Sequence, residues 1–366
     1  MIPLVDLAAQ HRQIADEVSA GFARVLERSS FILGAEVAEF ETSFARFVGV
    51  PHCVGTANGT DALELALRAL EIGRGDEVIV PANSFIASAL AVARAGATPV
   101  LVDCDAATLL LDVADVARRI TPQTRAIMPV HLYGQVAPIE DLLPFTLDRR
   151  IAIVEDAAQA QGATRHGRCA GTFGVVAGTS FYPAKNLGAY GDAGAVLTTS
   201  DAIAQRVRAL RNYGSEIKYV HAETGFNSRL DTLQAVVLNA KLKHLASWNA
   251  DRRRAARRYD ELLAGTPGLI LPVTLPGNEH IWHLYVVRVP RRDEVLARLT
   301  AAGIGAGIHY PKPIHLQGAF RQLGHRAGDF PVAERTAGEI LSLPLFAEIS
   351  PDQQERVVAV LKQALS

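Results

Sequence analysis

The chain has 366 residues, of which 49% are apolar and 20% charged, and its formal net charge at pH 7 is −1. This length exceeds that of a usual single core and predicts two domains, while the balanced charge argues against an electrostatic nucleic-acid-binding or membrane-surface protein. No apolar run reaches the ~20 residues that span a bilayer, and Asp6 interrupts the stretch where a signal peptide would need an apolar core.

Three cysteines, Cys53, Cys104 and Cys169, are scattered along the chain. They lack the paired spacing of a zinc site or a disulfide framework. We therefore expect buried thiols, no metal site, and a cytoplasmic protein that binds neither nucleic acid nor membrane.

Between Gly55 and Ser200, short β-rich runs alternate with amphipathic helical runs. Several of the β-rich runs are apolar throughout, which is typical of strands buried on both faces. The pattern predicts an α/β domain with a mostly parallel sheet covered by helices on both sides. The strand patterns lie at 76–82, 98–104, 125–134, 151–159, 175–182 and 194–200, and the helical patterns at 60–72, 84–95, 113–120 and 138–150.

The later part of the chain predicts a smaller α+β domain. Residues 230–264 form one long helical pattern, whose arginine-rich end indicates a solvated face, and the proline- and glycine-rich run 265–278 indicates a domain crossing. We place a large domain at 1–250 and a small C-terminal domain at 251–366. Its expected elements are strands at 283–289 and 304–310 and helices at 291–302, near 331–341 and at 351–365.

The segment "TANGTDALELALRAL" (56–70) places Gly59 just before an amphipathic helix. Free N–H groups at such a helix start, the positive end of the helix dipole and the Thr60 hydroxyl together suit a phosphate group. A plain helix cap by Asn58 or Thr60 explains the same residues. The segment is neither a P-loop nor a dinucleotide-binding fingerprint.

Two acids, Glu155 and Asp156, end the apolar strand "IAIVEDAAQA" (151–160). An acid in that position is partly desolvated and can pair with a buried cation. A helix cap or a solvated loop acid remains the alternative.

The next strand leads into "SFYPAKNLGAYGDAG" (180–194), which contains Lys185. This is the first lysine in a chain whose positive charge is nearly all arginine. An apolar, aromatic setting disfavours the charged form of a lysine, so its pKa falls and the amine becomes available for Schiff-base chemistry. A lysine whose stem packs on apolar groups while its head reaches water is the alternative.

Three features follow one another along one predicted sheet, where strand ends form the ligand-binding edge. They are the helix start at Gly59 and Thr60, which we call the phosphate cradle, the acid Asp156 at a strand end, and Lys185. Together they are the parts needed to hold pyridoxal 5′-phosphate. The cradle would anchor the phosphate, Asp156 would pair with the pyridinium nitrogen and Lys185 would bind the aldehyde. An arginine would stay protonated and form no imine.

The chain resembles, nearly end to end, the DegT/DnrJ/EryC1/StrS family of sugar aminotransferases. The resemblance implies an aspartate-aminotransferase-like large domain (PLP fold type I) and pyridoxal 5′-phosphate as cofactor. It lies in the ordered motifs "PLVDL" (3–7), "GTANGTDALELAL" (55–67), "VIVPANSFIASALAV" (78–92), "PVHLYGQ" (129–135), "EDAAQAQGA" (155–163), "SFYPAKNLGAYGDAGAV" (180–196), "GFNSRLDTLQAVVL" (225–238) and "GIHYPKPIHLQGAF" (307–320).

At the matching positions, the resemblance implies that Lys185 forms the Schiff base and that Asp156 is the partner of the ring nitrogen. It places Gln159 at the ring hydroxyl and Phe85 against the ring. For Phe85, a core aromatic is the alternative.

The resemblance also implies how the phosphate is held. Asn227 corresponds to a residue that this family lends to the phosphate of the neighbouring subunit, so we expect a homodimer with shared active sites. Within the same chain the expected phosphate contacts are Gly59, Thr60 and Ser180.

The substrate residues follow from the same resemblance. The motif "SFYPAKNLG" with Tyr182, together with "HYPKPIHLQ", is similar to members that aminate the 3-keto group of nucleotide-linked deoxysugars. Many 4-keto enzymes have a histidine at the position of Tyr182. Arg211 and Arg229 are candidates to neutralise a nucleoside diphosphate, with surface ion pairs as the alternative. The expected sugar pocket comprises Tyr182, His309, Tyr310 and His315, although a single histidine is often only structural or exposed.

The activity that the resemblance implies is amino transfer from glutamate to a nucleotide-linked keto-sugar, dTDP-3-keto-6-deoxyhexose, giving a dTDP-3-amino sugar for antibiotic or surface-glycan biosynthesis. A 4-keto nucleotide sugar, a UDP-linked 3-keto sugar and a cyclitol ketone are alternative acceptors. Lys185 argues against the few members that became dehydratases with histidine in its place. A non-catalytic sensor or scaffold is the alternative of another class, against which Lys185, Asp156 and Gln159 argue.

Overall fold

The computed structural model describes residues 1–146 and 149–366. Leu147 and Asp148, which fall within the helical pattern expected at 138–150, lie outside the described residues. The rest of that pattern contains the short helices η2 (Ile139–Leu142) and α6 (Leu143–Thr146).

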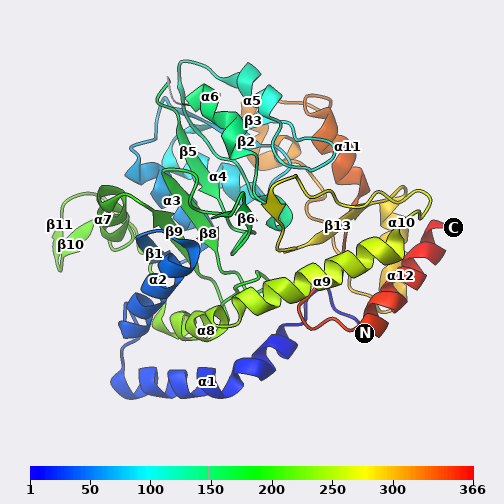
Figure 1. Cartoon of the computed structure of the whole chain (residues 1–366). Helices are drawn as coiled ribbons and strands as arrows, with labels where there is room; N and C mark the ends of the chain where they lie inside the picture. Colours follow the sequence, from blue (N-terminus) through cyan, green and yellow to red (C-terminus); the bar gives the residue numbers. More distant parts are fainter. Residues whose placement is uncertain (147–148) are drawn as a thin grey trace.

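A seven-stranded sheet forms the centre of the molecule (Figure 1), with the strand order β1-β9-β8-β5-β4-β2-β3. Strand β9 runs antiparallel to both β1 and β8, and the other neighbouring pairs are parallel. The predicted mostly parallel α/β sheet is confirmed. Its strands are β1 (His52–Thr56), β2 (Glu77–Pro81), β3 (Thr98–Val102), β4 (Thr124–Ile127), β5 (Ala152–Asp156), β8 (Val176–Ser180) and β9 (Gly194–Thr198).

The apolar strands are buried on both faces. In β2, Val78 and Val80 pack in one apolar cluster with helices α3 and α4, whereas Ile79 packs in another with Val116 of α5. Alternate side chains of a strand point to opposite faces, so a strand covered on both sides must be apolar at every position. The covering helices include α3 (Gly59–Ala69), α4 (Ile86–Ala95), α5 (Val113–Arg119) and α7 (Asp201–Leu210).

Two N-terminal helices, α1 (Leu7–Arg28) and α2 (Ala35–Val48), are additions to the elements expected from the sequence. The rings of Phe40 and Phe44 on α2 each make an edge contact with Phe181, with centroids 5.2 Å apart. Because Phe181 directly follows β8, these contacts pack α2 against the segment that leads to Lys185.

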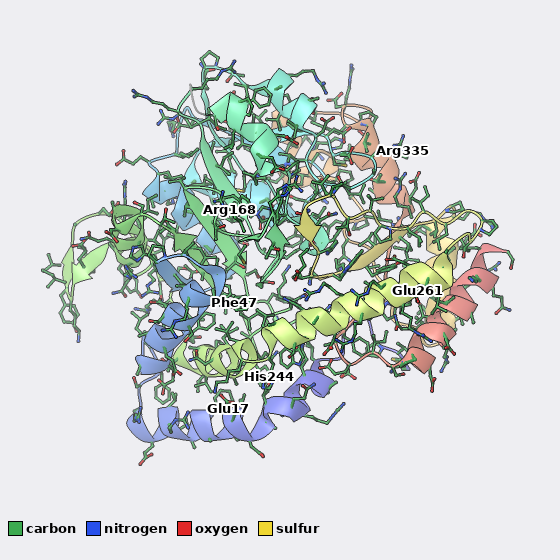
Figure 2. The ribbon with its side chains drawn as sticks, viewed as in Figure 1. Glu17, Phe47, Arg168, His244, Glu261 and Arg335 are labelled. Atoms are coloured by element: carbon green, nitrogen blue, oxygen red, sulfur yellow. The ribbon has the colours of Figure 1, made fainter. Side chains whose placement is uncertain are left out.

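The single helix expected at 230–264 is wrong: the structure has α8 (Thr232–Leu242) and α9 (Leu245–Leu263). The chain turns at His244, whose N–H donates to the Lys241 carbonyl in a tighter turn, and no proline or glycine marks the break. Figure 2 labels His244 at this junction and Glu17 on α1 below it; Glu17 pairs with Lys243 at 2.5 Å.

The C-terminal part contains the expected helices but only one of its expected strands. Residues 304–310 make isolated bridges from Ile304 and Gly307, because glycines at alternate positions leave few side chains to pack. Instead β13 pairs with β14, which begins where the helix near 331–341 was expected to end. The elements are β13 (Tyr285–Arg288), α10 (Arg292–Ala301), α11 (Pro331–Glu339), β14 (Ile340–Leu343) and α12 (Pro351–Leu365).

The division at residue 250 stays a prediction. Helix α9 continues through this position, and Ile2 packs with residues of α9, α10 and α12 in one apolar cluster.

Among the described residues, no helix is both long and apolar enough to cross a membrane. The remaining short elements are η1 (Leu132–Gly134), β6 (Thr164–Arg165), β7 (Arg168–Cys169), β10 (Ser215–Ile217), β11 (Val220–His221), β12 (Asn278–Glu279), η3 (Ile314–Leu316) and η4 (Gly318–Leu323).

Candidate active site

A cavity of about 420 Å³ lies at the carboxyl ends of β5 and β8. The starts of α3 and α4 and the segments 283 and 309–310 complete its wall. It brings together ten residues that were expected to contact the cofactor or the sugar, the predicted Schiff-base lysine among them, whereas Glu155, Asn227, His315 and the two candidate arginines, Arg211 and Arg229, do not line it. Those lining it are Gly59, Thr60, Phe85, Asp156, Gln159, Ser180, Tyr182, Lys185, His309 and Tyr310.

Lys185 lies in the turn that follows β8, where its N–H donates to the Tyr182 carbonyl at 2.8 Å. The turn closes tightly, since a Cβ at Gly188 would lie 2.2 Å from the Pro183 carbonyl oxygen. Burial lowers the pKa of Lys185 to about 8, against the opposing pull of the Asp156 charge. An amine with this pKa is partly unprotonated near neutral pH, as a nucleophile requires.

Asp156 is buried at the end of β5 and faces the cavity. Its carboxylate accepts the Ser88 hydroxyl at 2.7 Å and the Ala158 N–H at 3.1 Å. Burial raises the pKa of Asp156, while the two hydrogen bonds and the nearby Lys185 favour its charged form. A cation bound beside this carboxylate would favour the charged form further.

The neighbouring Glu155 does not line the cavity. It is fully buried on the other side of the strand, where it accepts the Gly171, Phe173 and Gly174 N–H groups at 2.6–2.7 Å and lies 2.8 Å from His131. Of the two strand-end acids, Asp156 therefore belongs to the site and Glu155 to the scaffold beneath it.

The start of α3 is both a capped helix end and a group of free N–H donors that could bind a phosphate. Asn58 caps the helix by accepting the Asp61 N–H at 2.9 Å, yet no acceptor among the described residues takes the N–H groups of Gly59 and Thr60. A Cβ at Gly59 would lie 2.6 Å from that of Ser180, so only glycine lets the helix start and β8 approach each other here. The two free amides and the Ser180 hydroxyl border the cavity and suit an anion.

Phe85 and Tyr310 form the aromatic part of the wall. Phe85 is 51% exposed, which contradicts the alternative of a core aromatic, and its ring lies 5.0 Å from that of Tyr310. Gln159 is buried, accepts the Tyr133 N–H at 2.6 Å and donates to the Tyr310 hydroxyl at 3.1 Å.

The histidines divide into two groups. His309 lines the cavity, and burial, aided by Lys185, lowers its pKa to about 4. His283 also lines it and was missed, because a lone histidine before a strand carries no sequence signal. His315 does not reach the cavity: it packs on Phe330 and lies 2.9 Å from Glu334.

Asn227 lies away from Lys185, in a second hollow of about 330 Å³ that also contains Arg229 and shares Asp192 with the cavity. Arg211 is a buried structural residue, since it binds Glu41 at 2.5 Å and the Gly55 carbonyl at 2.7 Å. The structure therefore removes Arg211 from the candidates for nucleoside diphosphate binding.

The lowered pKa of Lys185 predicts a pH-dependent stability of the apoenzyme. Below pH 8 the folded protein buries a charged amine; between pH 8 and 10.5 the unfolded chain holds more protons than the folded one, so stability rises with pH through this window. Apo Lys185→Met should thus be more stable than the wild type by on the order of 2 kcal/mol at pH 7. Urea unfolding should show this gap closing towards pH 10.5; a constant gap would contradict the assignment.

Ser88 is expected to tune Asp156. Ser88→Ala removes the hydroxyl donor, so the pKa of Asp156 should rise further and kcat should fall about tenfold. In a pH profile of kcat/KM, the acidic limb should move to higher pH. Ser84→Ala is the matched control, because the Ser84 hydroxyl donates to the Ser88 hydroxyl at 3.0 Å and to the Phe85 carbonyl at 3.1 Å but makes no bond to Asp156. It should change kcat by less than about threefold. Equal effects of both variants would contradict the role of Ser88.

A half-buried amine, a buried carboxylate and an anion cradle thus meet at the carboxyl ends of parallel strands. These groups fit pyridoxal phosphate, whose aldehyde, ring nitrogen and phosphate need one of each. Among the described residues, no group of three or more histidine, cysteine or acidic side chains could hold a metal ion. Fold and site together define a pyridoxal-phosphate-dependent enzyme of fold type I.

The sequence pattern of the DegT/DnrJ/EryC1/StrS aminotransferase family matches residues 12–362, and the chain belongs to this family. It is 47% identical over 361 residues to the erythromycin biosynthesis sensory transduction protein EryC1 of Saccharopolyspora erythraea, covering 99% of each chain. It is also 47% identical over 362 residues to the dTDP-3-amino-3,4,6-trideoxy-alpha-D-glucose transaminase of Streptomyces venezuelae, covering 99% of this chain and 96% of that one.

A solved structure is similar to this chain over nearly its whole length. The crystal structure of S. venezuelae DesV in complex with a ketimine intermediate has a TM-score of 0.97 at 47% identity, over 99% of this chain and 98% of that chain. The expectations of an aminotransferase with fold type I and pyridoxal phosphate as cofactor are confirmed.

Proposed function

We propose that the protein transfers the amino group of glutamate to a nucleotide-linked 3-keto-deoxysugar, of the dTDP-3-keto-6-deoxyhexose class, giving a dTDP-3-amino sugar. The observation that carries the proposal is the meeting of Lys185, Asp156 and the free amides of α3 around one cavity. The name of the S. venezuelae relative supports the position of the amine and the nucleotide. A 4-keto sugar, a UDP-linked 3-keto sugar and a cyclitol ketone are the competing acceptors.

When bound, pyridoxal phosphate supplies a reactive carbonyl and an electron-accepting ring. In the proposed arrangement Gly59, Thr60 and Ser180 hold the phosphate, and Asp156 keeps the ring nitrogen protonated. Phe85 lies against the ring.

Lys185 performs the proton transfers. Glutamate leaves as a 2-oxo acid and the keto-sugar leaves as an amino sugar, so a base must take a proton from the donor carbon and return one to the acceptor carbon. The Lys185 amine suits this task because burial lowers its pKa to about 8, near the working pH. Tyr182, which is 56% exposed at the mouth of the cavity, is placed to meet the acceptor.

We further propose that the active unit is a homodimer in which Asn227 serves the phosphate of the neighbouring subunit. The position of Asn227 outside its own cavity supports this, since it lies in the adjoining hollow. The free thiols of Cys53, Cys104 and Cys169 support a reducing, cytoplasmic setting.

Hybrid dimers test the shared site. A Lys185→Met subunit paired with an Asn227→Ala subunit should contain one intact site, with Lys185 from one subunit and Asn227 from the other. We expect about half of the wild-type activity from the purified hybrid, at wild-type cofactor affinity, whereas each parent dimer should be impaired. A hybrid that keeps the weaker cofactor affinity of Asn227→Ala would show that Asn227 acts within its own chain.

A sensor without catalysis is the second candidate, and the name of the S. erythraea relative favours it. Purified protein should be yellow and lose its visible absorbance when glutamate is added. A colourless protein that takes up no pyridoxal phosphate would support the sensor and contradict the enzyme.

A further inference from the structure

Tyr133 lies in η1, at a turn between the sheet and the C-terminal part. Its φ of 61° is in the left-handed region that non-glycine residues rarely adopt. Its carbonyl accepts the Leu284 N–H at 3.2 Å, and the carbonyl of Gly134 accepts the Ile281 N–H at 2.9 Å. A Cβ at Gly134 would lie 2.8 Å from the backbone nitrogen of His283. These contacts hold Tyr133 in a conformation that it would not adopt alone.

The backbone N–H of Tyr133 determines which way the Gln159 amide points. It donates to the Gln159 Oε1 at 2.6 Å, and a backbone N–H can only donate. The Gln159 Nε2 therefore faces the cavity side, where it donates to the Tyr310 hydroxyl at 3.1 Å. Because Tyr310 accepts this bond, its own O–H is left to donate. Burial raises the pKa of Tyr310, so the hydroxyl keeps its proton.

The side chain of Tyr133 closes the network from the other end. Its hydroxyl donates to the His309 carbonyl at 2.5 Å, directly before Tyr310. The His309 ring is held in turn by the Ser342 hydroxyl, 2.8 Å from Nδ1. Tyr133 thus contacts both the residue that donates to Tyr310 and the backbone that carries it, without lining the cavity itself.

We propose that Tyr133 is a positioning residue that fixes Gln159 and Tyr310 as a pair of hydrogen-bond donors for an oxygen acceptor bound in the cavity. The inference rests on the proposed function, in which this acceptor is the ring hydroxyl oxygen of the cofactor. Two aligned donors favour a ligand that presents an acceptor there over one that presents none.

Binding to the apoenzyme tests this without turnover. Tyr133→Phe removes the bond to His309 and should raise the Kd of pyridoxamine 5′-phosphate about tenfold. For the analogue that lacks the ring hydroxyl, the Kd values of variant and wild type should agree within about twofold, because the donors have no target. Equal weakening for both compounds, or none for either, overturns the proposal.

Tyr259→Phe is the matched control. Tyr259 is also buried, and Tyr259→Phe loses a similar bond, to the Pro344 carbonyl at 2.9 Å, in the C-terminal core. It should lower Tm like Tyr133→Phe but leave both Kd values unchanged.

If the Tyr133→Phe protein does not fold, a second variant tests the same proposal. Tyr310→Phe leaves Tyr133 intact and should show the same loss, selective for the compound with the hydroxyl; a loss that is not selective counts against the proposal. Wild-type apoenzyme that binds neither compound would overturn the proposed function itself, and the inference with it. This result differs from one in which only the variants behave as wild type.

Discussion

Lys185→Met is expected to lower kcat/KM for amino transfer by about 10⁴-fold, because it removes both the group that binds the cofactor and the base that moves the protons. Among the residues that line the cavity, Lys185 supplies the primary amine. Methionine keeps the unbranched stem, so the packing of the turn after β8 should survive. Formation of the 2-oxo acid from glutamate measures the loss.

Lys241→Met is the matched control for this variant. Lys241 on α8 is 1% exposed, and burial lowers its pKa to about 8, as for Lys185, but it does not line the cavity. If position decides the role, Lys241→Met should keep kcat/KM within about twofold. Comparable losses in both variants would mean that a buried amine at either position is merely structural.

Asp156→Asn is expected to lower kcat about 10³-fold, because a neutral amide cannot hold the proton on the ring nitrogen. The amide has nearly the same shape, and its oxygen can still accept the bond from Ser88, so the loss should be electrostatic. Stopped-flow measurement of the half-reaction with glutamate isolates the step concerned.

The adjacent acid provides the control for Asp156→Asn. Glu155→Gln makes the same chemical change on the other side of β5, among the N–H groups of Gly171, Phe173 and Gly174. It should lower Tm and leave kcat of the folded holoenzyme within about threefold. A larger effect on kcat for Glu155→Gln than for Asp156→Asn would reverse the assigned roles.

The central sheet and most of the cavity could be predicted because local rules determine them. Continuous apolar runs predicted the two-sided sheet, and the residues after each strand end, Gly59, Asp156 and Lys185, necessarily meet at one edge. Their chemistry, and not the fold alone, indicated the cofactor. The family resemblance added Gln159 and Phe85, which the strand pattern alone would have left as ordinary polar and core residues.

The remaining features depend on tertiary contacts that no local pattern encodes. Glu155 and Asp156 are adjacent acids, and only the packing on each face of β5 distinguishes them. His315 belongs to a promising motif, yet it binds Glu334 on α11 and does not reach the cavity. His283 reaches the cavity after a left-handed residue, Trp282, and Tyr133, itself left-handed, contacts Gln159 and His309 without lining the cavity. The break between α8 and α9 contains no proline or glycine from which it could be predicted.

The most direct test follows the nitrogen atom itself. The enzyme is incubated with nitrogen-15-labelled glutamate and a dTDP-3-keto-6-deoxyhexose, and the isolated sugar nucleotide is examined by NMR. We predict the labelled nitrogen on C3 of the sugar with wild-type enzyme and no labelled sugar with Lys185→Met. Label on C4, or label transferred equally well by Lys185→Met, would contradict this prediction.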